Sequence, residues 1–154
     1  MNPDQALLKR YLAHPHTELA IDSNPLAVAL RARFLGRDDG SIRLGFDPSR
    51  EFLQGNGVVQ GGIVAAMLDL TAAFTSLATL REGQTAATAS LSISFQAAVH
   101  AGPLIGTGVV ERAGRRLIFA RAQLQSADGG ELLASAQTVM SVLEANKIAG
   151  RLRR

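Results

Sequence analysis

The chain has 154 residues, a length that fits one domain. Hydrophobic residues make up 47% of it and charged residues 19%, a composition that can fill a core and excludes an intrinsically disordered chain. The formal net charge is +3 and there is no cysteine, which excludes disulfide bonds and thiolate metal sites. The first residues, MNPDQALLKRYLAHPH, contain no apolar signal core, so we expect a cytoplasmic protein.

The N-terminal part of the sequence predicts a short helix followed by a hairpin. Residues 3–13 are expected to be helical, because Asn2 can cap them and proline is tolerated in a first turn. Apolar residues alternate over 26–35, which predicts a half-buried strand, and they alternate again over 42–46. The turn sequence GRDDG at 36–40 then predicts a hairpin between the two strands.

The remainder predicts a loop over 47–57, one long helix from about 61 to 81, and a series of strands. Four strands are expected, near residues 89–96, 104–113, 116–127 and 131–143. Short turns between consecutive strands make an antiparallel sheet. We therefore expect one α+β domain over 1–154, with about six strands, one long helix and a loose tail after Ala145.

The predicted long helix contains a single carboxylate, Asp69, in a run from Ile63 to Leu80 that is otherwise apolar or small. A membrane span is disfavoured because such a charge costs about 2.5–3.5 kcal/mol on insertion scales and strand patterns flank the run. A helix that is apolar all round is instead expected to be buried on every face by a curling sheet. Asp69 is then either a structural acid, paired with a nearby arginine or amide, or a functional group.

Two glycines, Gly61 and Gly62, open this helix. They form either a plain tight turn or a site where free backbone amides at the positive end of the helix dipole hold an anion or an oxyanion. Asp69 lies eight residues after Gly61, about 12 Å along a helix. If both act on one substrate, we expect a symmetric dimer with the active site across the subunit interface.

The stretch GVVQGGIVAAMLD, residues 57–69, resembles the signature of the phenylacetate-pathway (PaaI-like) branch of hotdog-fold acyl-CoA thioesterases. That signature reads glycine, two apolar residues, His-Gly-Gly, and an acid eight residues after the first glycine of the pair. The stretch TASLSISFQAAV, residues 88–99, resembles the next strand of the branch. The resemblance spans about residues 25–143 and implies a hotdog fold, a curved sheet wrapped round one helix. It also implies an acyl-CoA substrate. Thioester hydrolysis needs a nucleophile and a stabilised oxyanion, so we expect no cofactor. The sequence leaves open whether dimers pair further into tetramers.

The resemblance also implies the roles of individual residues. Asp69 matches the catalytic carboxylate, acting as nucleophile or as general base, and the amide of Gly61 matches the group that polarises the thioester carbonyl. Gln54 matches an amide that orients the nucleophile or the carbonyl, and Thr88 matches a Ser/Thr that helps to position water. The neighbouring positions that would contact substrate are Gln60, Gly62 and, as an alternative amide, Asn56.

Gln60 departs from the pattern, because the branch usually has histidine there. Glutamine can donate a hydrogen bond to a carbonyl but cannot act as an acid or base. Hydrolysis by Asp69 is compatible with this change, and so is an acyl-CoA-binding protein without turnover. The chain's histidines lie outside the motif and are expected at the surface or in turns: His14, His16 and His100. Exposed arginines that could meet the CoA phosphates are Arg81, Arg112, Arg115 and Arg116.

Other function classes fit less well. A hotdog hydratase or dehydratase would pair a histidine with the acid, and the predicted helix has no histidine. No aromatic and basic residues interleave as in a single-strand nucleic-acid binder. The sequence contains no G-x-S-x-G elbow, no zinc-ligand spacing and no phosphate-binding loop, so we expect no metal site.

Overall fold

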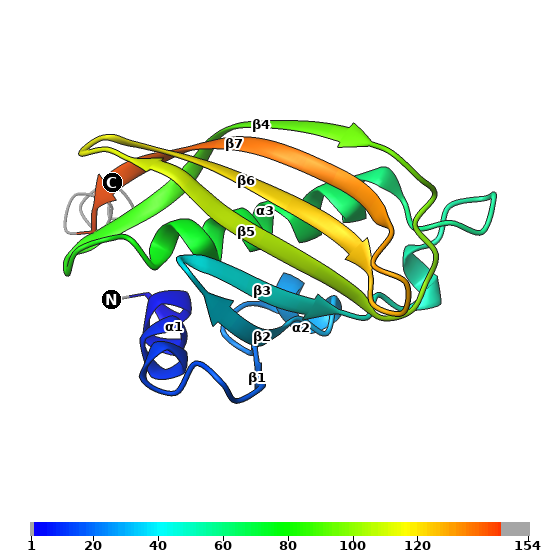
Figure 1. The fold of residues 1–154 in the computed structure, drawn as a ribbon, viewed down its shortest axis with the longest axis horizontal. Coiled ribbons are helices and arrows are strands. Elements are labelled where there is room, and N and C mark those ends of the chain that lie inside the picture. Colours follow the sequence, from blue (N-terminus) through cyan, green and yellow to red (C-terminus); the bar gives the residue numbers. More distant parts are fainter. Residues whose placement is uncertain (1, 146–154) are drawn as a thin grey trace, which may run out of the picture.

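The computed structural model describes residues 2–145, and its helices and strands form one sheet with a long helix against it (Figure 1). The helices are α1 (Pro3–Ala13), α2 (Pro25–Ala29), the short 3-10 helix η1 (Arg50–Phe52) and α3 (Gly61–Leu77). The strands are β1 (Leu19–Ala20), β2 (Arg33–Asp38), β3 (Ser41–Phe46), β4 (Gln84–Phe95), β5 (Leu104–Ala113), β6 (Leu117–Ser126) and β7 (Leu132–Glu144).

The sheet has seven strands in the order β1-β2-β3-β5-β6-β7-β4, and every neighbouring pair is antiparallel. Strand β4 leaves α3 and lies at one edge, where it pairs with β7, the last strand in the sequence. Helix α3 contacts β3 and the four long strands β4, β5, β6 and β7, which curve over it (Figure 1). The predicted α+β architecture of an antiparallel sheet around one long helix is confirmed.

The N-terminal helix is confirmed at the predicted bounds. The Asn2 side chain accepts a hydrogen bond from the Gln5 amide, the Gln5 side chain accepts one from the Asn2 amide, and Pro3 stands in the first turn. Tyr11 stacks on Phe34 of β2 with ring centroids 4.3 Å apart. Burial raises the pKa of the Tyr11 hydroxyl above its usual value.

The strand predicted over 26–35 is wrong in its first half. Residues 25–29 form helix α2, in which Leu26 and Val28 are exposed, and β2 begins only at Arg33. The physical cause is the cap, since the Asn24 side chain accepts a hydrogen bond from the Ala27 amide. The hairpin between β2 and β3 is confirmed, and Asp39 and Gly40 both adopt positive φ in its turn.

Other bounds differ by a few residues. Helix α3 ends at Leu77, four residues before the predicted end, and β4 begins at Gln84, five residues before the predicted start. The first residues of β4 are small or polar and do not alternate, so their strand character comes from pairing with β7. A seventh strand, the two-residue β1, was not predicted. The predicted loose tail after Ala145 lies outside the described residues.

One face of α3 packs very closely on β5. Thr71 and Thr75 are buried and donate their hydroxyls to carbonyl oxygens one turn earlier in the helix. Opposite them lie Gly106 and Gly108, where an added Cβ would overlap the threonine side chains. The glycines therefore allow the strand backbone to approach the helix.

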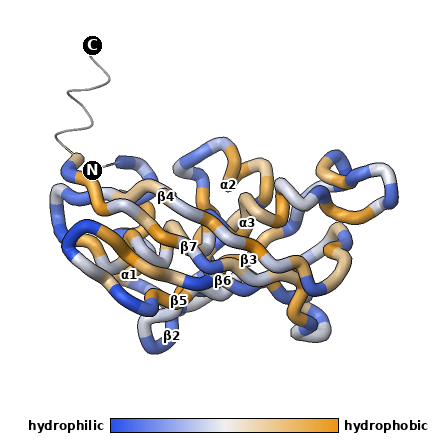
Figure 2. The backbone as a smooth tube through the Cα atoms, turned by 90° about the horizontal axis from the view of Figure 1, so that it is seen from above, coloured by the Kyte–Doolittle hydropathy of each residue, from blue (hydrophilic) through white to orange (hydrophobic). Residues whose placement is uncertain are grey.

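The opposite face of α3 is only half-buried, which corrects the expectation that the sheet would bury every face. The half-buried residues are Ile63, Ala65, Ala66, Asp69, Leu70, Ala73 and Leu77. The sheet covers one side of the helix, and this second side, the open face of α3, borders the edge strand β4 (Figure 1). Figure 2 shows hydrophobic stretches along the strands and α3, and hydrophilic stretches at the outer loops.

Candidate active site

Asp69 lies on the open face of α3, and its carboxylate faces the edge strand. Thr88 of β4 donates its hydroxyl to Asp69 Oδ1 at 2.8 Å. The Thr88 hydroxyl also lies 3.5 Å from the sulfur of Met140, on the neighbouring strand β7. The structure thus brings together two of the predicted site residues, from a helix and from a strand that begins 15 residues after Asp69 in the sequence. The half-buried carboxylate is hydrogen-bonded and still reachable from outside.

The N-terminus of α3 is open to solvent. Gln60 is the N-cap residue, makes no side-chain cap hydrogen bond, and is exposed together with Gly61 and Gly62. The amides of Ile63 and Val64 donate to the Gln60 carbonyl. The amides of Gly61 and Gly62 precede them and have no carbonyl one turn back to which they could donate. Free amides at a helix N-terminus can bind a negatively charged oxygen, and this role of the glycine pair stays a prediction.

An aromatic ring borders these amides, and its place in the site was not predicted. Phe95 ends β4 and is 57% exposed, although it is large and apolar. Its ring carbon Cζ lies 3.5 Å from the position that a Cβ on Gly61 would take. The alternation over 89–96 placed Phe95 on the same strand face as Leu91 and Ile93, but the pattern carried no information on which residue of the helix it meets.

The loop before α3 positions the remaining predicted residues. The backbone amide of Gln54 donates to the Val58 carbonyl. The side-chain oxygen Oε1 of Gln54 accepts from the backbone amide of Asn56 at 2.6 Å, so this oxygen faces its own loop. Asn56 is exposed and is followed by Gly57 at φ 78°. The Val59 amide donates to the Val99 carbonyl at 2.7 Å, which ties this loop to the segment after β4.

Within one chain, Gly61 and Asp69 remain apart, because eight residues of helix separate them by about 12 Å. Two cavities of about 460 and 490 Å³ lie elsewhere in the described part of the chain. One is between α1 and the end of α3 and is lined in part by Arg81, and the other is at the loop before β5 and is lined in part by His100. Asp69, Thr88 and the residues at the N-terminus of α3 line neither cavity. Gln60, Gly61, Gly62 and Thr88 are all exposed, so the candidate site is an open surface of the single chain.

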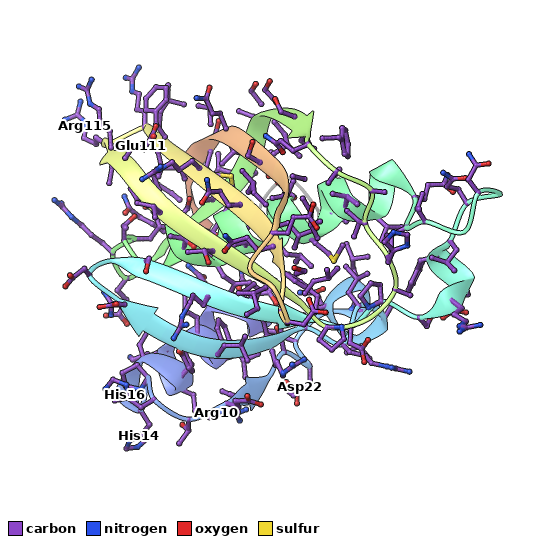
Figure 3. The ribbon with its side chains drawn as sticks, turned by 45° about the vertical axis from the view of Figure 1, so that its right-hand side comes forward. Arg10, His14, His16, Asp22, Glu111 and Arg115 are labelled. Atoms are coloured by element: carbon purple, nitrogen blue, oxygen red, sulfur yellow. The ribbon has the colours of Figure 1, made fainter. Side chains whose placement is uncertain are left out.

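The histidines and arginines lie at the periphery. His14 and His16 point outward beyond the end of α1, and Arg115 and Glu111 extend from the β5–β6 hairpin (Figure 3). Glu111 pairs with Arg121 at 3.6 Å. Within residues 2–145, no cluster of histidine and carboxylate side chains could hold a metal ion. Across the same range, no helix is both long and apolar enough to cross a bilayer.

Comparison with known proteins places this geometry in a family. The sequence model of the thioesterase superfamily matches residues 56–133, which contain Gly61, Asp69, Thr88 and Phe95. Among the curated proteins none matches the chain.

Solved structures share the fold. The phenylacetic acid degradation-related protein of Ralstonia eutropha JMP134 is 31% identical with a TM-score of 0.75, over 88% of this chain and 98% of that one. A thioesterase family protein from Silicibacter pomeroyi is 20% identical with a TM-score of 0.75, over 92% and 98% of the chains. A thioesterase from Haemophilus influenzae is 17% identical with a TM-score of 0.74, over 80% and 85%. The seven-stranded sheet around α3 is the hotdog fold of these proteins, and the chain belongs to the thioesterase superfamily.

Proposed function

We propose that this chain hydrolyses acyl-CoA thioesters, using the Asp69 carboxylate and an oxyanion site at the N-terminus of α3. The observation that carries the proposal is the 2.8 Å hydrogen bond from Thr88 to Asp69, which fixes a carboxylate on the open face of α3. Membership of the thioesterase superfamily supports the reaction class. CoA as the thiol and the residue roles below belong to the proposal.

The chemistry needs a nucleophile and a stabilised oxyanion. The oxygen of water bonds to the carbonyl carbon, the carbon–sulfur bond breaks, and the products are a carboxylic acid and free CoA thiol. Asp69 takes part either as a general base that receives a proton from water or as a nucleophile whose acyl anhydride water then cleaves. In both routes the carbonyl oxygen gains negative charge, and the amides of Gly61 and Gly62 stabilise it.

The loop residues assist by hydrogen bonding. Gln54 keeps its Oε1 on the Asn56 amide, which leaves its Nε2 directed to the substrate carbonyl or to the nucleophile. Gln60, exposed beside Gly61, donates to the substrate, and Asn56 is the alternative donor of the loop. Thr88 holds Asp69 or the attacking water in position.

A second copy of the chain completes the site. Strand β4 is an edge strand of 12 residues, and so long an edge is a template for pairing with another chain. The open face of α3 beside it is apolar apart from Asp69. Pairing two copies through β4 covers both, and it brings Gly61 of one protomer to Asp69 of the other. The assembly is a dimer, and two dimers can join as a tetramer.

The first measurement is release of CoA from a panel of acyl-CoAs, followed with a thiol-reactive dye. The protein has no cysteine and therefore adds no thiol background. Asp69→Asn keeps the size of the side chain and an oxygen that can accept from Thr88, but it removes the base and the nucleophile. We expect kcat to fall by roughly 10²–10⁴-fold, as for the loss of a general base.

Circular dichroism and sedimentation of Asp69→Asn serve as controls, and both should match the wild type. Equal turnover by wild type and Asp69→Asn would exclude Asp69 as the catalytic group. The replacement of histidine by Gln60 favours a second function, in which the chain binds acyl-CoA without hydrolysis. Saturable acyl-CoA binding with no CoA release by the wild type would identify that function.

A further inference from the structure

A cavity of about 460 Å³ lies at the opposite end of α3 from the glycine pair. Figure 1 shows that α1 lies beside this end of α3, near the start of β4. The cavity is lined from α1 by Gln5, Leu8, Lys9 and Leu12, and from the end of α3 and the following turn by Leu77, Ala78, Leu80, Arg81, Glu82 and Gly83, with Ala145 after β7. Its volume lies in the range of small-molecule sites in proteins.

The cavity walls are mainly apolar, as in a binding site for a hydrocarbon chain. Leucines from both helices and from the turn supply the inner walls, and Leu8 is 2% exposed. The charged lining residues are Lys9, Arg81 and Glu82, and all three are exposed, so their charges remain in water. A saturated chain placed between the leucines would be removed from water, which is favourable for each methylene that is buried.

The cavity and the candidate active site lie along the same pair of elements, helix α3 and strand β4. Helix α3 and strand β4 run side by side in opposite directions: Gly61 meets Phe95, Asp69 meets Thr88, and Leu77 and Gly83 both line the cavity. We call this line the α3–β4 seam. Leu77 follows Asp69 by eight residues, so the cavity begins about 12 Å beyond the carboxylate.

Side chains along the α3–β4 seam are small on the cavity side of Asp69. Ala73 lies one helical turn after Asp69 on the same face of α3, and Ala86 lies two residues before Thr88 on the same face of β4. In the other direction a register shift between Thr88 and Ser90 brings Leu91, Ile93 and Phe95 to the same face of β4 as Thr88, and these side chains are bulky. The path from Asp69 toward the cavity is therefore the one bordered by the smaller side chains.

We infer that this cavity receives the far end of a straight acyl chain, and that the preferred substrates are medium- or long-chain acyl-CoAs rather than short or compact aromatic ones. The inference rests on the proposed function, because it takes Asp69 as the position of the thioester carbon. Ala73 and Ala78 then determine chain length, since Ala73 lies on α3 between Asp69 and Leu77, and Ala78 lines the cavity.

The test compares kcat/KM for butyryl-CoA, phenylacetyl-CoA, lauroyl-CoA and palmitoyl-CoA in wild type, Ala73→Leu and Ala78→Leu. Wild type should prefer lauroyl-CoA over butyryl-CoA and phenylacetyl-CoA. Each variant should lower the lauroyl-to-butyryl ratio by roughly tenfold or more, because a few atoms in a hydrophobic pocket discriminate by that much. The matched control is Ala98→Leu, the same change in the 490 Å³ cavity, and it should leave the ratio unchanged.

A variant that enlarges the cavity distinguishes a change in specificity from a loss of folding. Leu12→Ala enlarges the cavity and should raise the palmitoyl-to-lauroyl ratio, a gain that a damaged protein cannot show. Two outcomes overturn the inference in an active enzyme: a wild-type preference for butyryl-CoA or phenylacetyl-CoA, or the same lauroyl-to-butyryl ratio in Ala73→Leu, Ala78→Leu and Ala98→Leu. A wild type that hydrolyses no thioester overturns the proposed function itself, and the inference with it.

Discussion

The two faces of α3 use small or short side chains in opposite ways. On the packed face, Thr71 and Thr75 lie against Gly106 and Gly108 of β5, and no further atom fits between them. On the open face, alanines surround Asp69, and at Gly62 an added Cβ would have no atom within 4 Å. Small residues give close contact on one face and accessible space on the other.

The packed face of α3 therefore contributes mainly to stability, and the open face carries the groups of the candidate site. Larger side chains on the packed face would overlap neighbouring atoms, because protein interiors have little free volume. The open face contributes less buried area and can hold a carboxylate, free amides and an exposed aromatic ring. Substitutions on the open face should therefore change activity with little loss of stability, and substitutions on the packed face should do the reverse.

After Asp69→Asn, the largest expected effect on activity is at the start of α3. Gly61→Pro removes one amide hydrogen at the first helical position, where proline is tolerated. Gln60 has φ −59° and ψ 138°, which suits a residue before proline. We expect kcat for acyl-CoA to fall by roughly 10²–10³-fold, as for the loss of one oxyanion donor, with an unchanged melting temperature. Gly61→Ala, which keeps the amide, is the control and should remain active.

The same variant tests the shared site. When Gly61→Pro and Asp69→Asn subunits are mixed, each mixed dimer has one site with both changes and one site with neither, provided that the two groups come from different protomers. The mixture should regain about a quarter of the wild-type activity, since half of the dimers are mixed. An inactive mixture whose subunits exchange would show that each site belongs to one protomer, and an active monomer in sedimentation would exclude the dimeric site altogether.

The next effect is on the packed face. Gly108→Ala places a Cβ against the Thr75 side chain and 2.9 Å from the Thr71 carbonyl oxygen, so either the helix or the strand must shift. The free energy of unfolding should fall by about 1–3 kcal/mol, measured by urea denaturation. Gly62→Ala is the matched control on the open face and should be neutral or slightly stabilising. Similar losses in both variants would show that the two faces do not differ as described.

The smallest effect is expected at the hydrogen bond between α3 and β4. Thr88→Val keeps the shape of the side chain and removes the hydroxyl that donates to Asp69 at 2.8 Å. We expect kcat to fall roughly tenfold. This is the lower end of the effect of losing a hydrogen bond to a charged group, and we expect the lower end because Thr88 is exposed. Thr88→Ser should retain most of the activity. A Thr88→Val enzyme with unchanged kcat would assign the hydroxyl no part in positioning Asp69.

Much of the fold could be predicted from local patterns. The helix at 61, the hairpin at Asp39 and Gly40, and the strands after 104 all follow from apolar periodicity and turn residues. The same rules could have found α2, because Asn24 followed by Pro25 repeats the cap of Asn2 and Pro3. The alternation of apolar residues after Pro25 was followed instead, and it favoured a strand.

The site could be predicted in part. Asp69 stands out as the single carboxylate of an apolar helix, the family resemblance adds Thr88, and the structure places the two in contact. Their roles stay predictions. The proximity of Phe95 to Gly61 and the glycines opposite Thr71 and Thr75 could not be predicted, because they depend on how β4 and β5 lie on α3. No pattern within the helix indicated that one face would stay uncovered, since every residue around Asp69 is apolar or small.

The pairing of β4 with β7 also determines when the site can form. Gln84 pairs with Glu144 and Phe95 with Ala134. Strand β4, which carries Thr88, can therefore join the sheet only after β7, the last strand of the sequence, has formed. Contacts of such large sequence separation close late and slow folding. During synthesis, Asp69 and the glycine pair emerge long before β7, and β4 stays unpaired in the interval. The contact of Thr88 with Asp69 is therefore expected among the last to form, which makes it a reporter of completed folding.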